Sequence, residues 1–75
     1  MTLRVECYSG YKAEERPFRF ELDGHDHIVE EVVDQWQSLD ATYFKVRSDD
    51  GDTYVLRHIL SRQEDIWSLE SFRRG

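Results

Sequence analysis

The sequence has few of the features on which small exported proteins and membrane proteins depend. It holds one cysteine, Cys7, so it cannot form an internal disulfide, whereas small secreted domains usually need several. No apolar run approaches the roughly 18 residues of a membrane helix, and residues 1–6 lack the apolar core of a signal peptide. These absences predict a cytoplasmic protein that is neither exported nor anchored in a membrane.

Glycine and proline are also scarce, with four glycines and one proline. The glycines are too scattered along the chain to build a loop that cradles a phosphate. The nucleophile elbow G-x-S-x-G is absent as well, and a chain this short has few residues with which to form a pocket. We therefore expect no enzymatic activity and no cofactor.

The hydrophobic content is nevertheless sufficient for a folded protein. Hydrophobic residues make up 39% of the chain and aromatic residues 13%, which is too apolar for a disordered segment. A typical domain has roughly 100 to 150 residues, whereas this chain has 75. The composition thus predicts one small domain, residues 1–75, with a thin core.

The negative charge is concentrated in one segment. The chain carries a net charge of -6, and acidic and basic residues balance on either side of residues 23–40. Within that segment there is no Lys or Arg, and the acids are Asp23, Asp26, Glu30, Glu31, Asp34 and Asp40. Such a run is typical of a solvated face, and the alternative is a surface that binds a basic partner.

Alternation of apolar and polar residues predicts strands over most of the chain. Residues 3–8 and 18–22 alternate strictly, and Asp23-Gly24 then supplies a turn signal. Residues 9–17 between them follow no period, so we interpret them as a long loop. A last strand is predicted over residues 66–72, after a polar loop at 61–65.

Residues 28–36 are ambiguous between strand and helix, because four of their apolar residues also fit one helix face. The stretch is short, rich in β-branched residues and without a helix cap, so we favour a strand. A bulge near Glu30-Glu31 would let Ile28 and Val33 both point inward.

Residues 43–57 predict a β-hairpin whose register depends on the length of its loop. A two-residue loop would turn half of the large apolar residues outward. A three-residue loop, 49–51, places Gly51 in the left-handed position of a type I turn with a G1 bulge. The longer loop buries four large side chains as two cross-strand pairs, Val46 with Tyr54 and Phe44 with Leu56. We favour that register, and we expect Trp67 and Leu69 of the last strand on the same buried face.

Together these elements predict an all-β fold: one small antiparallel meander of five or six strands, curled into an open barrel. The segments 7–17, 29–36, 43–57 and 67–69 resemble a family of short bacterial cytoplasmic proteins of unknown function. Val32 to Leu69 is also similar to a small C-terminal domain of some bacterial damage-tolerance polymerase-like proteins. The resemblance implies a bacterial origin but no activity and no catalytic residue, and residues 59–65 are longer than the family's usual turn.

The candidate metal ligands have simpler interpretations. His25 and His27 lie two residues apart, a spacing that metal sites use, and His58 and Cys7 could add ligands. No pattern brings these four together, so we expect no metal. The acids around Gly51 fail the spacing of a calcium-binding EF-hand loop, and turn formation accounts for them.

The sequence offers two binding surfaces. The first combines the loop residues Tyr8, Tyr11, Lys12 and Arg16 with the acids Asp26, Glu30 and Asp34, and it predicts a protein partner. The second is the outward side of the hairpin, where Tyr43, Lys45, Arg47 and Arg57 would form a basic strip for single-stranded nucleic acid. We expect a non-catalytic module that binds another protein, with nucleic-acid binding as the alternative. The same loop could instead cover one open end of the barrel, and the strip could be a salt-bridged face.

Overall fold

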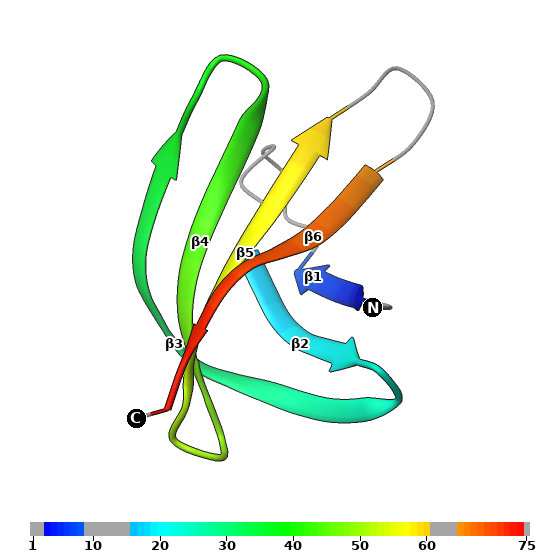
Figure 1. Ribbon diagram of the computed structural model, residues 1–75, viewed down its shortest axis with the longest axis vertical. Coiled ribbons are helices and arrows are strands. Elements are labelled where there is room, and N and C mark those ends of the chain that lie inside the picture. The colour runs from blue at the N-terminus through cyan, green and yellow to red at the C-terminus, as the bar shows by residue number, and fades with distance from the viewer. Residues whose placement is uncertain (1–2, 9–15, 61–64, 75) are drawn as a thin grey trace.

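The computed structural model describes residues 3–8, 16–60 and 65–74, which form an antiparallel meander. Its strands are β1 (Leu3–Tyr8), β2 (Arg16–Leu22), β3 (His25–Gln37), β4 (Ala41–Ser48), β5 (Thr53–Leu60) and β6 (Asp65–Arg73). Each strand pairs with the next, and the sheet curls into a half-barrel (Figure 1). The predicted fold class is confirmed. The described residues include no helix suited to crossing a membrane.

Two tight turns set the register of the sheet. Asp23 and Gly24 both have positive φ, 49° and 85°, as a two-residue hairpin turn requires. In the β4–β5 hairpin, Gly51 has φ 85° and its N–H donates to the Ser48 carbonyl at 3.0 Å. The cross-strand partners are Val46 with Tyr54 and Phe44 with Leu56. The three-residue loop and its register are therefore confirmed.

Residues 28–36 form a strand, as predicted, because they all lie within β3. The register shifts between Val29 and Glu31, which confirms the bulge near Glu30, and it shifts again between Val32 and Asp34. This second bulge changes which apolar residues point inward.

The prediction that Ile28 and Val33 both point inward is wrong. Ile28 is 48% exposed and Val33 46% exposed, while Val29 and Val32 pack against the core. Ile28 follows His27, whose strand partner is the buried Phe20, so alternation turns Ile28 outward. Val33 is the extra residue of the second bulge.

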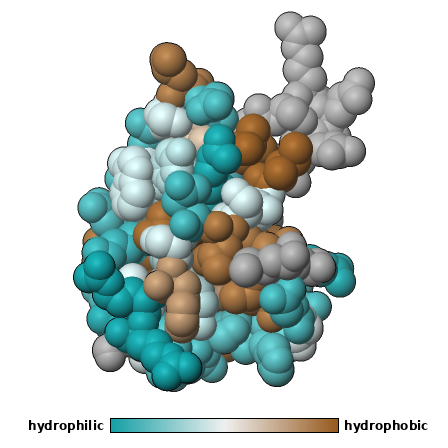
Figure 2. Space-filling view, viewed as in Figure 1, coloured by the Kyte–Doolittle hydropathy of each residue, from teal (hydrophilic) through white to brown (hydrophobic). Residues whose placement is uncertain are grey.

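The core joins β2 to the β4–β5 hairpin. Its buried members are Phe20, Phe44, Val46, Tyr54 and Leu56. Trp67 and Leu69 pack against them, which confirms the predicted shared face. In Figure 2 hydrophobic residues gather toward the middle of the view, around β5 and β6, between hydrophilic margins. Burial of each large side chain stabilises the fold by about 1.5 to 3 kcal/mol.

The predicted loop 9–17 is wrong at its end, because Arg16 and Pro17 belong to β2. Pro17 lies opposite Cys7, next to a register shift, and beyond the part of β2 that pairs with β3. A proline is tolerated there because its missing N–H removes no bond from a regular ladder. The rest of that loop, residues 9–15, lies outside the described residues.

Candidate functional site

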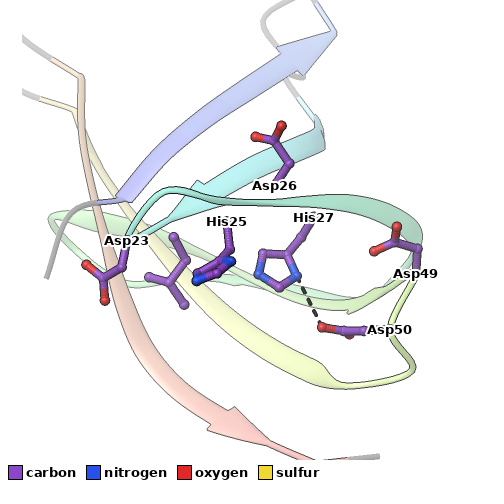
Figure 3. A pocket seen from close by; sticks show the side chains of 7 residues that line it. Asp23, His25, Asp26, His27, Asp49 and Asp50 are labelled. Carbon is purple, nitrogen blue, oxygen red and sulfur yellow. Dashed lines mark ion pairs between the residues drawn. The ribbon is translucent and has the colours of Figure 1, made fainter.

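The loop between β4 and β5 contacts β3, a strand that begins far from it in the sequence. The Asp49 N–H donates to the Ile28 carbonyl at 2.9 Å, and the Ile28 N–H donates to Asp49 Oδ1 at 3.3 Å. This places the β4–β5 loop beside the first residues of β3 (Figure 3). Between them lies a shallow hollow of about 500 Å³, lined by Leu22, Asp23, His25, Asp26, His27, Asp49 and Asp50.

Asp50 is the most connected side chain of this hollow. Its carboxylate accepts hydrogen bonds from the Ser48 hydroxyl, from the Asp52 N–H at 3.0 Å and from the Tyr54 hydroxyl at 3.1 Å. It also lies 3.2 Å from Nδ1 of His27 (Figure 3). One carboxylate thus ties together β3, β4 and β5.

These contacts change the acidity of two groups. Partial burial raises the pKa of Asp50, but the hydrogen bonds from Ser48, Asp52 and Tyr54 and the attraction of His27 together hold it below its ordinary value. Burial, and then the hydrogen bond to Asp50, raise the pKa of Tyr54 to about 12. Asp50 is therefore an anion, and Tyr54 a neutral donor, over the ordinary pH range.

The contacts of this cluster stabilise the fold and do not form a catalytic site. The ring of His27 stacks on Phe20 with centroids 4.8 Å apart and lies 5.2 Å from the ring of Tyr54. Ser48 is fully buried and donates to Asp50, so its hydroxyl is not presented to a substrate. Nothing in this arrangement provides an accessible nucleophile with a base beside it.

The metal-ligand candidates of the sequence lie in different parts of the fold. His25 and His27 extend from the same side of β3 in Figure 3, but His25 is exposed and His27 lies against the core. His58 is buried and stacks on Trp67 at 4.2 Å. Among the described residues, no three potential ligand side chains are placed to hold a metal ion.

The residues predicted to bind a protein are only partly described. Tyr8 ends β1 and Arg16 begins β2 with an exposed side chain, while Tyr11 and Lys12 lie outside the described residues. Of the predicted acids, Glu30 and Asp34 are exposed on β3. Asp26 is exposed too, but its carboxylate accepts a hydrogen bond from Arg19 at 2.8 Å. The three acids therefore differ in their availability to a partner.

The four residues predicted to bind nucleic acid do share one face of the sheet. Tyr43 is the strand partner of Arg57, and Lys45 and Arg47 follow at two-residue intervals on the same side of β4. Arg47 is held by Glu31 at 2.8 Å, so the predicted salt-bridged face exists in part. The pattern did not reveal that Trp36 of β3 stacks on Tyr43, with centroids 5.4 Å apart and planes at 4°.

Comparison with known proteins adds no further identification. No protein-family model, curated protein or solved structure matches the chain. The resemblance to the bacterial family therefore stays a prediction.

Proposed function

We propose that this chain is a binding module without catalytic activity, and that its partner is a basic protein. The proposal rests on where the fold places the acidic residues. Residues 23–40 comprise β3 and the turns at its two ends, and four of the six acids of this segment lie on the strand itself.

One edge of this strand is open. The first four residues of β3 pair with β2, whereas residues 29–37 pair with β4 on the other side. Beyond Ile28, none of the described strands pairs with the edge of β3 opposite β4. An open edge offers backbone groups to an extended segment of a partner.

Exposed apolar side chains accompany the acids along this stretch. Val33 is 46% exposed and Trp36 41%, and Leu39 in the turn is fully exposed. Large apolar side chains that lie close together at the surface can anchor a protein partner. The expected partner segment thus combines basic residues with an apolar residue.

The charges that remain available define where the basic residues would bind. Asp26 is paired with Arg19, and Glu31 with Arg47. Glu30 and Asp34 take part in no ion pair among the residues that the structure describes. Asp34 follows Val33 directly and Glu30 precedes it by three residues, so complementary charges on the partner would speed its association and set its register.

Selection of displayed random peptides on the immobilised protein tests this proposal and does not require that the partner be identified first. We expect the enriched sequences to alternate Lys or Arg with large apolar residues. Their binding should weaken as salt rises, because exposed charges are screened. Failure to enrich any peptide, or enrichment of peptides without basic residues, would reject the proposal.

Variants then place the binding site on the molecule. The double variant Glu30→Lys and Asp34→Lys should abolish peptide binding, and Leu39→Ser should weaken it. The matched control reverses two exposed acids elsewhere, Glu6→Lys and Glu70→Lys, for the same change in net charge. Glu6 lies 4.0 Å from Arg19, a weak pair between solvent-exposed groups, so its reversal should cost little stability. Equal loss in both charge variants would show that only the total charge matters, contrary to the proposal.

A further inference from the structure

The outward side of the sheet carries a second surface, which shares Trp36 with the acidic one. Strand pairing places Trp36, Tyr43 and Arg57 in one row across β3, β4 and β5. The next two rows join Asp34, Lys45, Val55 and Ser71, and then Glu31, Arg47, Thr53 and Arg73. We name this side of β3–β6 the outward face. From the side chains in these rows, we infer that the outward face binds single-stranded nucleic acid.

The aromatic pair supplies a stacking platform. Trp36 and Tyr43 lie parallel at 5.4 Å, which fixes the orientation of both rings, and Trp36 remains 41% exposed. A ring held in this way can accept a base on its free side with little further loss of conformational freedom. Stacking of this kind tolerates every base, because each base has a π-face.

A groove continues from this platform across the sheet. It has a volume of about 270 Å³ and is lined by Trp36, Lys45, Thr53, Val55, Ser71 and Arg73. Among the described residues, neither Lys45 nor Arg73 takes part in an ion pair, whereas Arg47 beside them is held by Glu31. Two cations and two hydroxyl groups next to an exposed ring match a phosphate that lies next to a base.

The exposed ring and the cations of the groove together favour a single strand of nucleic acid over an acidic peptide. An acidic peptide satisfies the cations but offers no regular planar group to Trp36. A single strand offers a base and a phosphate at every nucleotide, so it engages the platform and the groove together. Of the acids that cause the net charge of -6, Glu31 and Asp34 lie at the β3 edge of the outward face, opposite Arg47 and Lys45. Arg73, on β6, lies at the far side of the groove from both.

Fluorescence anisotropy with labelled single-stranded DNA and RNA tests the inference. Oligonucleotides of about 16 nucleotides would cover one small barrel. We expect binding at about 100 µM protein or less in low salt. If Lys45, Arg57 and Arg73 each contact a phosphate, raising NaCl from about 50 to about 200 mM should weaken binding about 20-fold. Absence of binding at that protein concentration in low salt would overturn the inference.

Variants locate the binding on the outward face. Trp36→Ala should weaken binding at least about fivefold, and Trp36→Phe should restore most of it, because stacking requires only a ring. The pair Lys45→Glu and Arg73→Glu should remove binding. Arg4→Glu changes an exposed cation of β1 and should bind almost as the original protein does. Circular dichroism verifies that each variant is folded.

The variants also distinguish this surface from the acidic one. Leu39→Ser should leave oligonucleotide binding intact, and Arg73→Glu, on β6, should leave selection of basic peptides intact. Lys45 is the strand partner of Asp34, so its variant does not separate the two surfaces. If a poly-glutamate peptide binds the groove while oligonucleotides do not, the outward face belongs to acidic proteins and the inference is wrong. If Trp36→Ala binds oligonucleotides as well as the original protein does, the inference is also wrong.

Discussion

Replacing Asp50 by Ala should be strongly destabilising, although much of this side chain is at the surface. The change removes the acceptor of the Ser48 and Tyr54 hydroxyls, and both of those residues are buried. A buried donor left without an acceptor costs about 1 to 3 kcal/mol. The contact with His27 adds little, because it is an ion pair only when His27 is protonated and because the Asp50 side chain is 37% exposed to water. We expect a total loss of about 2 to 4 kcal/mol.

That loss is large for this chain, because 75 residues correspond to a free energy of unfolding of about 4 to 11 kcal/mol. Urea unfolding followed by circular dichroism measures it, and the melting temperature should fall by roughly 10 to 30 °C. Asp49→Ala is the matched control, since the side chain of Asp49 accepts one long hydrogen bond, 3.3 Å, from a backbone N–H. If both alanine variants unfold alike, the cluster does not stabilise the fold and the reasoning fails.

The pH dependence of stability gives a second measurement on the same group. Because the pKa of Asp50 is lowered by folding, its contribution is present above the pKa of the unfolded chain. It is lost as the pH falls through the lower pKa of the folded state. Asp50→Asn should therefore lose less stability between neutral and acidic pH than the original protein does. If Asp50→Asn loses as much stability between neutral and acidic pH as the original protein does, Asp50 is not held as an anion by the fold.

Three further changes probe the fold. Gly51→Val should cost about 1 to 2 kcal/mol in urea unfolding, because φ is 85° there while a Cβ would meet no atom within 4 Å; an unchanged midpoint would contradict the turn assignment. The phenol of Tyr54 should ionise near pH 12 in an absorbance titration, with Tyr54→Phe identifying its signal, and ordinary titration near pH 10 would refute its burial. Its contribution to stability is complete below pH 10 and is lost as the pH rises toward 12. Phe20→Ala should cost about 3 to 5 kcal/mol and unfold much of the protein at room temperature, whereas Phe20→Leu should stay folded by circular dichroism.

The sheet could be predicted because each strand carries its own alternation and the turns carry their own chemistry. Gly51 and the four large residues around it were sufficient to select one hairpin register over the other. The Asp23-Gly24 turn also determines a register. A two-residue turn pairs Leu22 with His25 and therefore Phe20 with His27, so the stacking of these rings follows from the turn.

The candidate site was harder to predict, because its contacts depend on register shifts and on separate strands. The second bulge of β3 exposes Val33 and decides that Trp36 faces Tyr43, and no residue type marks its position. In the sequence, Asp50 has only the character of a turn former. Its partners come from β3, β4 and β5. The hydroxyl groups that donate to it belong to Ser48 and Tyr54, two residues whose side chains are otherwise buried.

The two bulges of β3 also bear on how an open strand edge avoids pairing with a second copy of itself. Each bulge interrupts the regular spacing of backbone groups, and the acids Glu30 and Asp34 lie next to these interruptions. Two such edges side by side would bring like charges together, which opposes pairing. A basic segment at this edge would be attracted instead, because the same acids would neutralise its charges. The features that make this edge a poor surface for self-association therefore support the proposal of a partner of opposite charge.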